Sequence, residues 1–231
     1  MIEVLKTVIY FPLLNALVFL YNYIPDIGVV IVLLTLIIRI ILAPSHHKSI
    51  KSQQAMTSLQ PKLNELREKY KGDKEAQARE MMNLYKEHKI NPFSSCLPLL
   101  IQLPILIGLF YVFRDGLTNH LTGIYSFVPN PELINPMFLN FIDLSKPNVI
   151  LAVLAGASQL WQSWLMQPKT ASSDATSKIM RVQMTYILPA ITVFIGLKFP
   201  AGLPLYWIVT TLFAVGQHYY IMKKYPELVA K

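Results

Sequence analysis

The chain has 231 residues, of which 53% are hydrophobic and only 15% are charged. A soluble domain carries about 25% charged residues, so this composition argues against a soluble protein and indicates a membrane protein. In a membrane protein, the positions of the charges behind the formal net charge of +8 indicate how the chain is oriented in the bilayer. We therefore do not take this charge as a sign of nucleic-acid binding, and we expect no DNA partner.

The sequence offers little for catalysis or metal binding. The single cysteine, Cys96, rules out an internal disulfide. His46 and His47 are adjacent, so on a helix they diverge and cannot share one metal ion. The sequence contains no Walker loop, no GxGxxG and no GxSxG motif. We therefore expect no cofactor, no metal and no enzymatic reaction.

Residues 1–26 are expected to be extracytoplasmic. Within them, residues 8–24 (VIYFPLLNALVFLYNYI) are apolar enough to cross a bilayer. Their proline, asparagines and tyrosines instead suit a helix that lies in the membrane interface. We favour the interfacial helix, and a sixth membrane span is the alternative.

The first span is expected over residues 27–44. Its residues 29–44, VVIVLLTLIIRIILAP, are apolar except for Thr35, Arg39 and the closing Pro44. A charged side chain at the bilayer centre costs roughly 3 kcal/mol. No Asp or Glu lies within any predicted span to pair with Arg39. Either Arg39 reaches back to the cytoplasmic interface, as long basic side chains do, or it serves a function inside the membrane.

Segment 45–92 is the only long polar region of the sequence. Its apolar residues step by three and four, first at Met56, Leu59, Leu63, Leu66 and Tyr70, and then at Ala78, Met81, Tyr85 and His88. This spacing predicts an antiparallel helical hairpin, in which Pro61 kinks or restarts the first arm. The segment has ten basic and six acidic residues, which suits anionic lipid, ribosomal RNA or simple retention in the cytoplasm.

Four further spans are expected over residues 93–113, 148–166, 182–198 and 203–222. Polar side chains within them, Gln102, Gln159 and Gln162, usually face a bundle interior or a water-filled cavity. For any one glutamine, an interhelical hydrogen bond is the simpler interpretation, and such bonds contribute about 0.6 kcal/mol on average.

The basic residues set the orientation. Segments 45–92, 167–181 and 223–231 together carry sixteen Lys and Arg, whereas the residues on the other side carry four. Because cytoplasmic loops are rich in Lys and Arg, these three segments are expected in the cytoplasm. Residues 1–26, 114–147 and 199–202 then lie outside, with the N-terminus out and the C-terminus in.

Four sequence stretches, taken together, resemble a known family. They are LQPKLNELREKYKGDK, INPFSSCLPLLIQLPI, DLSKPN and FPAGLPLYW, and they resemble the YidC-type membrane protein insertases with their mitochondrial Oxa and chloroplast Alb relatives. The chain looks like the compact form, without the large external domain of many members. Its tail is short, so we do not expect the tail-mediated ribosome docking of long-tailed members.

The resemblance implies an all-α membrane protein in which five transmembrane helices enclose a hydrophilic groove. The groove carries one positive charge, which matches Arg39, and Gln102, Gln159, Gln162 and Trp207 are candidate lining residues. Such a protein inserts nascent membrane proteins into the bacterial cytoplasmic membrane, alone or with the Sec translocon. A small transporter or channel, and a scaffold that gathers partners on the hairpin, are the alternatives; a transporter usually shows inverted repeats, and we find none.

Overall fold

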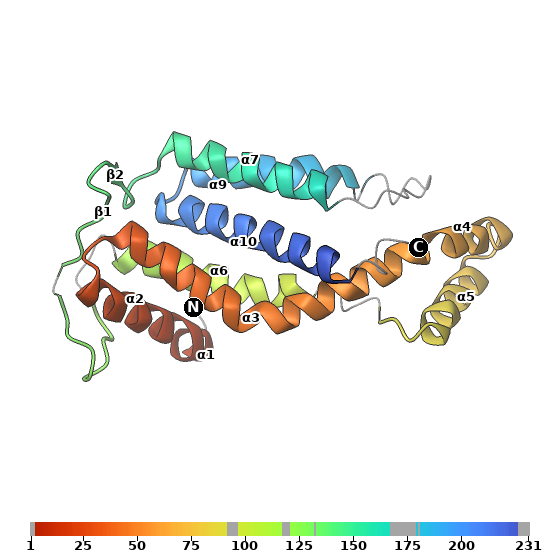
Figure 1. The fold of residues 1–231 in the computed structure, drawn as a ribbon, viewed down its shortest axis with the longest axis horizontal. Helices are drawn as coiled ribbons and strands as arrows, with labels where there is room; N and C mark the ends of the chain where they lie inside the picture. Colours follow the sequence, from red (N-terminus) through yellow and green to blue (C-terminus); the bar gives the residue numbers. More distant parts are fainter. Residues whose placement is uncertain are drawn as a thin grey trace.

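The computed structural model describes residues 3–91, 97–116, 121–131, 133–166, 179 and 181–225. The described chain is predominantly helical, as expected. Most of its helices lie side by side along one long axis, and α4 and α5 lie beyond one end of this group (Figure 1). A short antiparallel pair of strands, β1 (Met137–Phe138) and β2 (Ile142–Asp143), lies at one end. Most of the loop expected over 167–181, and tail residues 226–231, are outside the described part.

The N-terminal segment forms one helical stretch, made of α1 (Glu3–Leu5), the π-helical turn η1 (Lys6–Tyr10) and α2 (Phe11–Tyr23). The loop that follows α6 contacts α2 along its length. Asn15 donates to the carbonyl of Gly123 (3.1 Å), and Asn22 donates to the carbonyl of Pro129 (2.8 Å). The Tyr21 hydroxyl accepts from the Asn135 amide (3.0 Å). Three of the polar residues that favoured an interfacial helix, Asn15, Tyr21 and Asn22, therefore bind this loop.

Helix α3 (Ile27–Ser58) begins at Asp26, which accepts a hydrogen bond from the Val29 amide and so caps the helix. The helix does not end at Pro44, where the sequence predicted the end of the first span. A proline inside a helix removes one N–H and disturbs the carbonyl four residues earlier. At this point of α3, Gln217 on α10 donates to the carbonyl of Ala43 (3.0 Å) and so links the two helices.

Two helices follow α3 and fold back on each other (Figure 1). They are α4 (Gln60–Lys69) and α5 (Lys74–Glu87). Pro61 lies in the first turn of α4, where its missing N–H would have no helical partner in any case. Asp73 accepts hydrogen bonds from the amides of Glu75 and Ala76 at the start of α5. Leu63 of α4 is fully buried.

The remaining helices pack as a group. Helix α6 (Leu97–Gly116) lies beside α3, and α10 (Gly202–Lys224) packs against both α3 and α7 (Val149–Leu165). The π-helical turn η3 (Gln183–Ile187) and helix α9 (Leu188–Gly196) pack on α7. Small residues allow the close approach, since a Cβ on Gly196 would lie 2.8 Å from the Cβ of Ala152.

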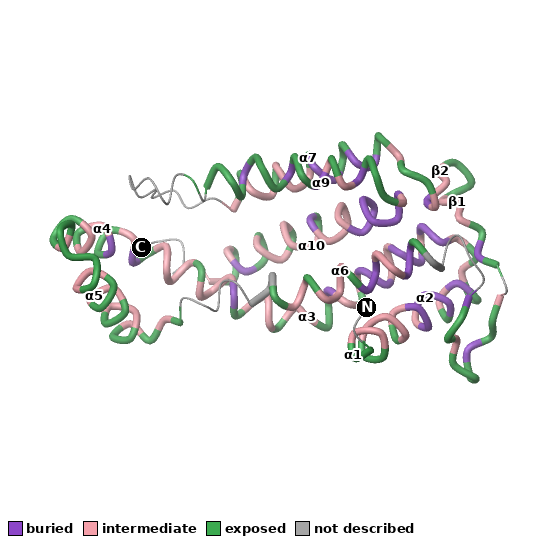
Figure 2. Tube along the Cα trace, turned by 180° about the vertical axis from the view of Figure 1, so that it is seen from behind, coloured by how far each residue is buried: buried purple, intermediate pink, exposed green. Residues whose placement is uncertain are grey.

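Buried residues are concentrated at the end of the molecule opposite α4 and α5 (Figure 2). Leu17, Ile31, Phe113 and Tyr206, from four different helices, are each at most 1% exposed. This packed end is where the DLSKPN and FPAGLPLYW stretches meet. The Ala201 amide donates to the carbonyl of Lys146 (3.0 Å), and thereby joins the two stretches.

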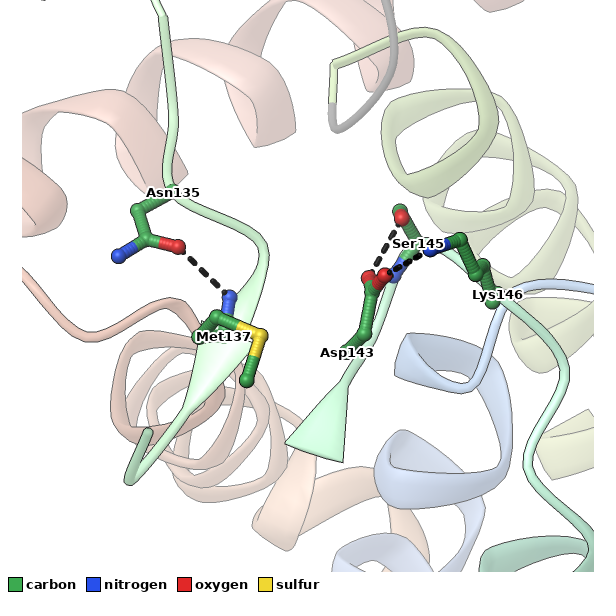
Figure 3. A network of polar contacts seen from close by, with 5 residues as sticks. All are labelled: Asn135, Met137, Asp143, Ser145 and Lys146. Carbon is green, nitrogen blue, oxygen red and sulfur yellow. Dashed lines mark hydrogen bonds and ion pairs between the residues drawn. The ribbon is translucent and has the colours of Figure 1, made fainter. Parts of the chain in front are cut away.

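The DLSKPN stretch is itself held by local bonds (Figure 3). Asp143 accepts from the amide (3.0 Å) and the hydroxyl (2.5 Å) of Ser145, and its carboxylate pairs with Lys146 (2.9 Å). The Ser145 hydroxyl, more than Lys146, holds the pKa of Asp143 below its ordinary value. Asn148 then caps α7 by accepting from the Leu151 amide. The stretch is a rigid start for α7.

Candidate functional site at Arg39

Arg39 lies on α3, on the side that faces α6 and α10. Its side chain is only 6% exposed. It binds His46, which is seven residues further along α3 and therefore on the same face of the helix. The Nη1 atom of Arg39 lies 3.1 Å from Nε2 of His46. Since a guanidinium can only donate, Nε2 of His46 accepts and carries no proton.

Gln102 links Arg39 to a third helix. Its Oε1 atom on α6 accepts from Nη2 of Arg39 (3.1 Å). Its amide nitrogen in turn donates to the hydroxyl of Tyr206 on α10. The chain of contacts His46–Arg39–Gln102–Tyr206 therefore ties α3, α6 and α10 together around one cation.

The partners of Arg39 are neutral groups. None of the ion pairs between described residues involves Arg39. A buried cation is costly unless a counter-charge or several hydrogen bonds stabilise it. The bonds to His46 and Gln102 occupy two of the five guanidinium donors, and the Tyr206 hydroxyl interacts with the same group. The site can therefore donate to a further acceptor, and a carboxylate would also supply the missing negative charge.

None of the described hydrogen bonds joins Arg39 to the other three candidate lining residues, Gln159, Gln162 and Trp207. Gln159 accepts from the Thr192 hydroxyl (2.5 Å), between α7 and α9, and Gln162 donates to the sulfur of Met166 on its own chain segment (3.7 Å). Trp207 packs against the apolar core. The structure thus brings Gln102 to Arg39, whereas the described hydrogen bonds of Gln159 and Gln162 go to other partners. A role in a groove stays a prediction for all four.

Sequence reasoning missed His46 and Tyr206. His46 was considered only as a metal ligand, although its spacing of seven residues from Arg39 is a signal for a shared helix face. His47 does diverge from it, and lies against the ring of Tyr225 instead (5.5 Å between ring centres). Tyr206 lies within FPAGLPLYW next to the chosen Trp207, and only the fold shows which of the two faces Gln102.

Among the residues that the structure describes, two helical stretches have the length and apolar composition of membrane spans, Glu3–Tyr23 and Ile27–Ser58. Shorter apolar helices cover Leu100–Arg114, Val149–Leu165 and Gln183–Gly196. By length and composition, these helices are consistent with a helical membrane protein.

Comparison with known proteins gives the family. Residues 19–228 match the family described as 60Kd inner membrane protein. The membrane protein insertase YidC of Clostridium tetani is 40% identical over 198 residues, which cover 85% of this chain and 80% of that protein. YidC of Lawsonia intracellularis is 40% identical over 215 residues, which cover 92% of this chain. The match to the Lawsonia protein spans 38% of that protein's length.

A solved structure supports the same family. The crystal structure of an active YidC insertase with its first transmembrane domain resolved is similar with a TM-score of 0.64 and 29% identity, over 93% of this chain and 46% of that one. The chain therefore belongs to the family of the YidC membrane protein insertases, as the four sequence stretches predicted.

Proposed function

We propose that this protein inserts integral membrane proteins into the bacterial cytoplasmic membrane and helps them to fold. Its relatives are named membrane protein insertases. The observation that carries the proposal is Arg39, a buried cation in an apolar helix. Its described partners, His46, Gln102 and Tyr206, include no carboxylate.

The magnitudes support this role. An acidic residue at the bilayer centre costs about 2.5–3.5 kcal/mol. A hydrogen bond to a charged group contributes about 1.5–3 kcal/mol. One contact between Arg39 and a substrate carboxylate therefore offsets most of the cost of carrying that acidic residue across. The hydrophobic partition of the substrate helix into lipid then drives the remaining step.

Exchange of partners is the proposed working step. In the present conformation Arg39 is enclosed, and His46 and Gln102 accept its hydrogen bonds. A carboxylate is a stronger acceptor for a guanidinium than a neutral imidazole or amide. An arriving acidic residue consequently displaces the neutral acceptors with a net gain, and α3 and α6 part to admit it. In this open state, the space between α3 and α6 is the hydrophilic groove that receives the substrate.

Five membrane spans surround that groove, and the N-terminus lies outside. The spans are residues 27–44, 93–113, 148–166, 182–198 and 203–222. Both Asn15 and Asn22 bind the loop at residues 121–135, which the charge distribution places outside. Because this loop follows α2 over at least two turns, residues 8–24 fit an outer interfacial helix. Helices α4 and α5 receive the substrate on the cytoplasmic side. The partners on that side are a ribosome that delivers the substrate, or the Sec translocon.

Reconstitution of the purified chain in liposomes tests the proposal. We expect it to insert a short single-span protein with an acidic translocated tail without any other protein. Arg39→Ala should lower insertion about tenfold to a hundredfold, the equivalent of the lost contact. Arg39→Lys should retain more activity because it keeps the charge. Insertion by Arg39→Ala at the wild-type rate would contradict the mechanism.

A further inference from the structure

A cleft of about 840 Å³ lies between α3 and α10. The residues that line it from each helix recur at steps of three and one, so that each helix contributes a single face. They are Ile40, Ala43, Pro44, His47, Lys48 and Lys51 on α3, and Phe213, Gly216, Gln217, Tyr220 and Ile221 on α10.

The cleft is separate from the Arg39 site. Arg39 turns toward Gln102 on α6, whereas Ile40, the next residue, is 62% exposed and lines the cleft. Successive residues of a helix point about 100° apart. The two sites thus use different faces of α3 and do not compete for the same side chains.

The chemistry of the cleft changes along its length. Ile40, Ala43 and Phe213 make one end apolar, and His47, Lys48 and Lys51 make the other end basic. Lys51 lies 3.7 Å above the centre of the Tyr225 ring, which holds its ammonium group at this end. No carboxylate is among the described lining residues.

Further charges extend the basic end. Lys223 and Lys224 form the last turn of α10. The carbonyls at the end of a helix amount to about half a negative charge, and these two lysines outweigh it. The cleft therefore combines an apolar floor with a positively charged rim, the complement of an anionic amphiphile.

We propose that this cleft binds one anionic phospholipid molecule. Its phosphate lies against Lys48 and Lys51, and an acyl chain lies along Ile40 and Phe213. This assignment depends on the membrane boundary proposed at Pro44, which divides the apolar lining from the basic lining, but not on insertion activity. Tyrosines such as Tyr220 and Tyr225 are typical of the headgroup level.

Gly216 provides a steric test. A Cβ at this position would meet no atom within 4 Å, so a large side chain can enter the cleft without displacing protein. Glycine inside a helix also costs up to about 1 kcal/mol relative to alanine. Gly216→Phe should therefore keep the fold, which thermal unfolding can verify, while it occupies the space of the acyl chain.

Native mass spectrometry of the full chain in a neutral detergent measures the binding. The probes are dioleoyl phosphatidylglycerol, dioleoyl phosphatidylcholine with the same chains, and glycerol phosphate as the soluble headgroup. We expect the wild-type protein to retain one phosphatidylglycerol in preference to the other two. Because a lysine near an anionic surface contributes about fivefold, the double variant Lys48→Gln/Lys51→Gln should weaken phosphatidylglycerol binding about twenty-five-fold.

The matched control is Lys74→Gln/Lys86→Gln, which removes the same charge from exposed positions of α5. It should bind phosphatidylglycerol like the wild type, and Gly216→Phe should lose the bound lipid. Equal weakening in both lysine double variants, or unchanged binding by Gly216→Phe, would overturn the proposal. So would equally tight binding of glycerol phosphate, because the ligand would then be a soluble phosphate rather than a lipid.

Discussion

Replacing Gln102 by Glu gives Arg39 a negatively charged partner and hardly changes the shape of the site. The Oε1 atom of Gln102 already lies 3.1 Å from Nη2 of Arg39, so a glutamate in the same rotamer forms an ion pair. The contact with Tyr206 is also kept, since the phenol hydroxyl can donate to the new carboxylate. Stability should therefore be close to that of the wild type.

The expected loss of function follows from the strength of that ion pair. Two unit charges about 4 Å apart interact with about 4 kcal/mol at an effective dielectric constant of 20. A substrate carboxylate would have to displace this resident partner, and 4 kcal/mol corresponds to roughly a thousandfold lower occupancy. Gln102→Glu should consequently insert an acidic-tail substrate as poorly as Arg39→Ala does.

The assay is insertion into liposomes, with protection of the translocated tail from added protease as the readout. The control variant is Gln102→Met, which fills similar volume, removes both hydrogen bonds and adds no charge. It should be less stable than Gln102→Glu and yet insert the acidic substrate better. If Gln102→Glu inserted that substrate at the wild-type rate, neutralising Arg39 would have no consequence and the reasoning would be refuted.

Three further predictions concern the fold and orientation. Gly28→Ala should lower the melting temperature, because its Cβ would lie 2.0 Å from the Phe138 ring and such overpacking costs about 1–3 kcal/mol; Gly216→Ala is the control that should not. The lowered pKa of Asp143 means that its carboxylate stabilises the folded state above about pH 4 and that this contribution is lost as the pH falls. Asp143→Asn should thus lower the melting temperature at pH 7, and this difference should shrink as the pH falls below about 4; a constant difference would contradict this. Thr7→Cys, with Cys96 replaced by Ser, should react with an impermeant maleimide added outside; reaction from the cytoplasmic side alone would make residues 8–24 a span.

Residue spacing predicted much of the helical architecture. Helices α4 and α5 lie in the segment expected for the hairpin. On the predicted apolar face of its first arm, Leu59 and Leu63 are buried, whereas no residue of α5 is buried. The continuation of α3 through Pro44 was not predicted. A proline is a strong local stop signal, whereas the packing of α10 along α3, with Gln217 bound to the carbonyl of Ala43, depends on residues far away in the sequence.

The site was harder to predict than the fold. Arg39 was identified because a charge in an apolar run is conspicuous at any position. Its partners were not, because a hydrogen bond between helices depends on rotation and depth, which composition does not determine. Gln102 and Gln159 look alike in sequence, yet one contacts Arg39 and the other Thr192. The polar residues of α2 similarly bind a loop more than a hundred residues away.

The most direct test of the charge mechanism changes the substrate rather than the protein. Two single-span substrates would be compared that differ only in Asp or Asn within the translocated tail, each with wild-type protein and Arg39→Ala in liposomes. For the Asp tail, wild-type insertion should exceed that of Arg39→Ala by about tenfold or more, and for the Asn tail the two should be equal. An equal ratio for both tails would show that Arg39 does not act on substrate carboxylates.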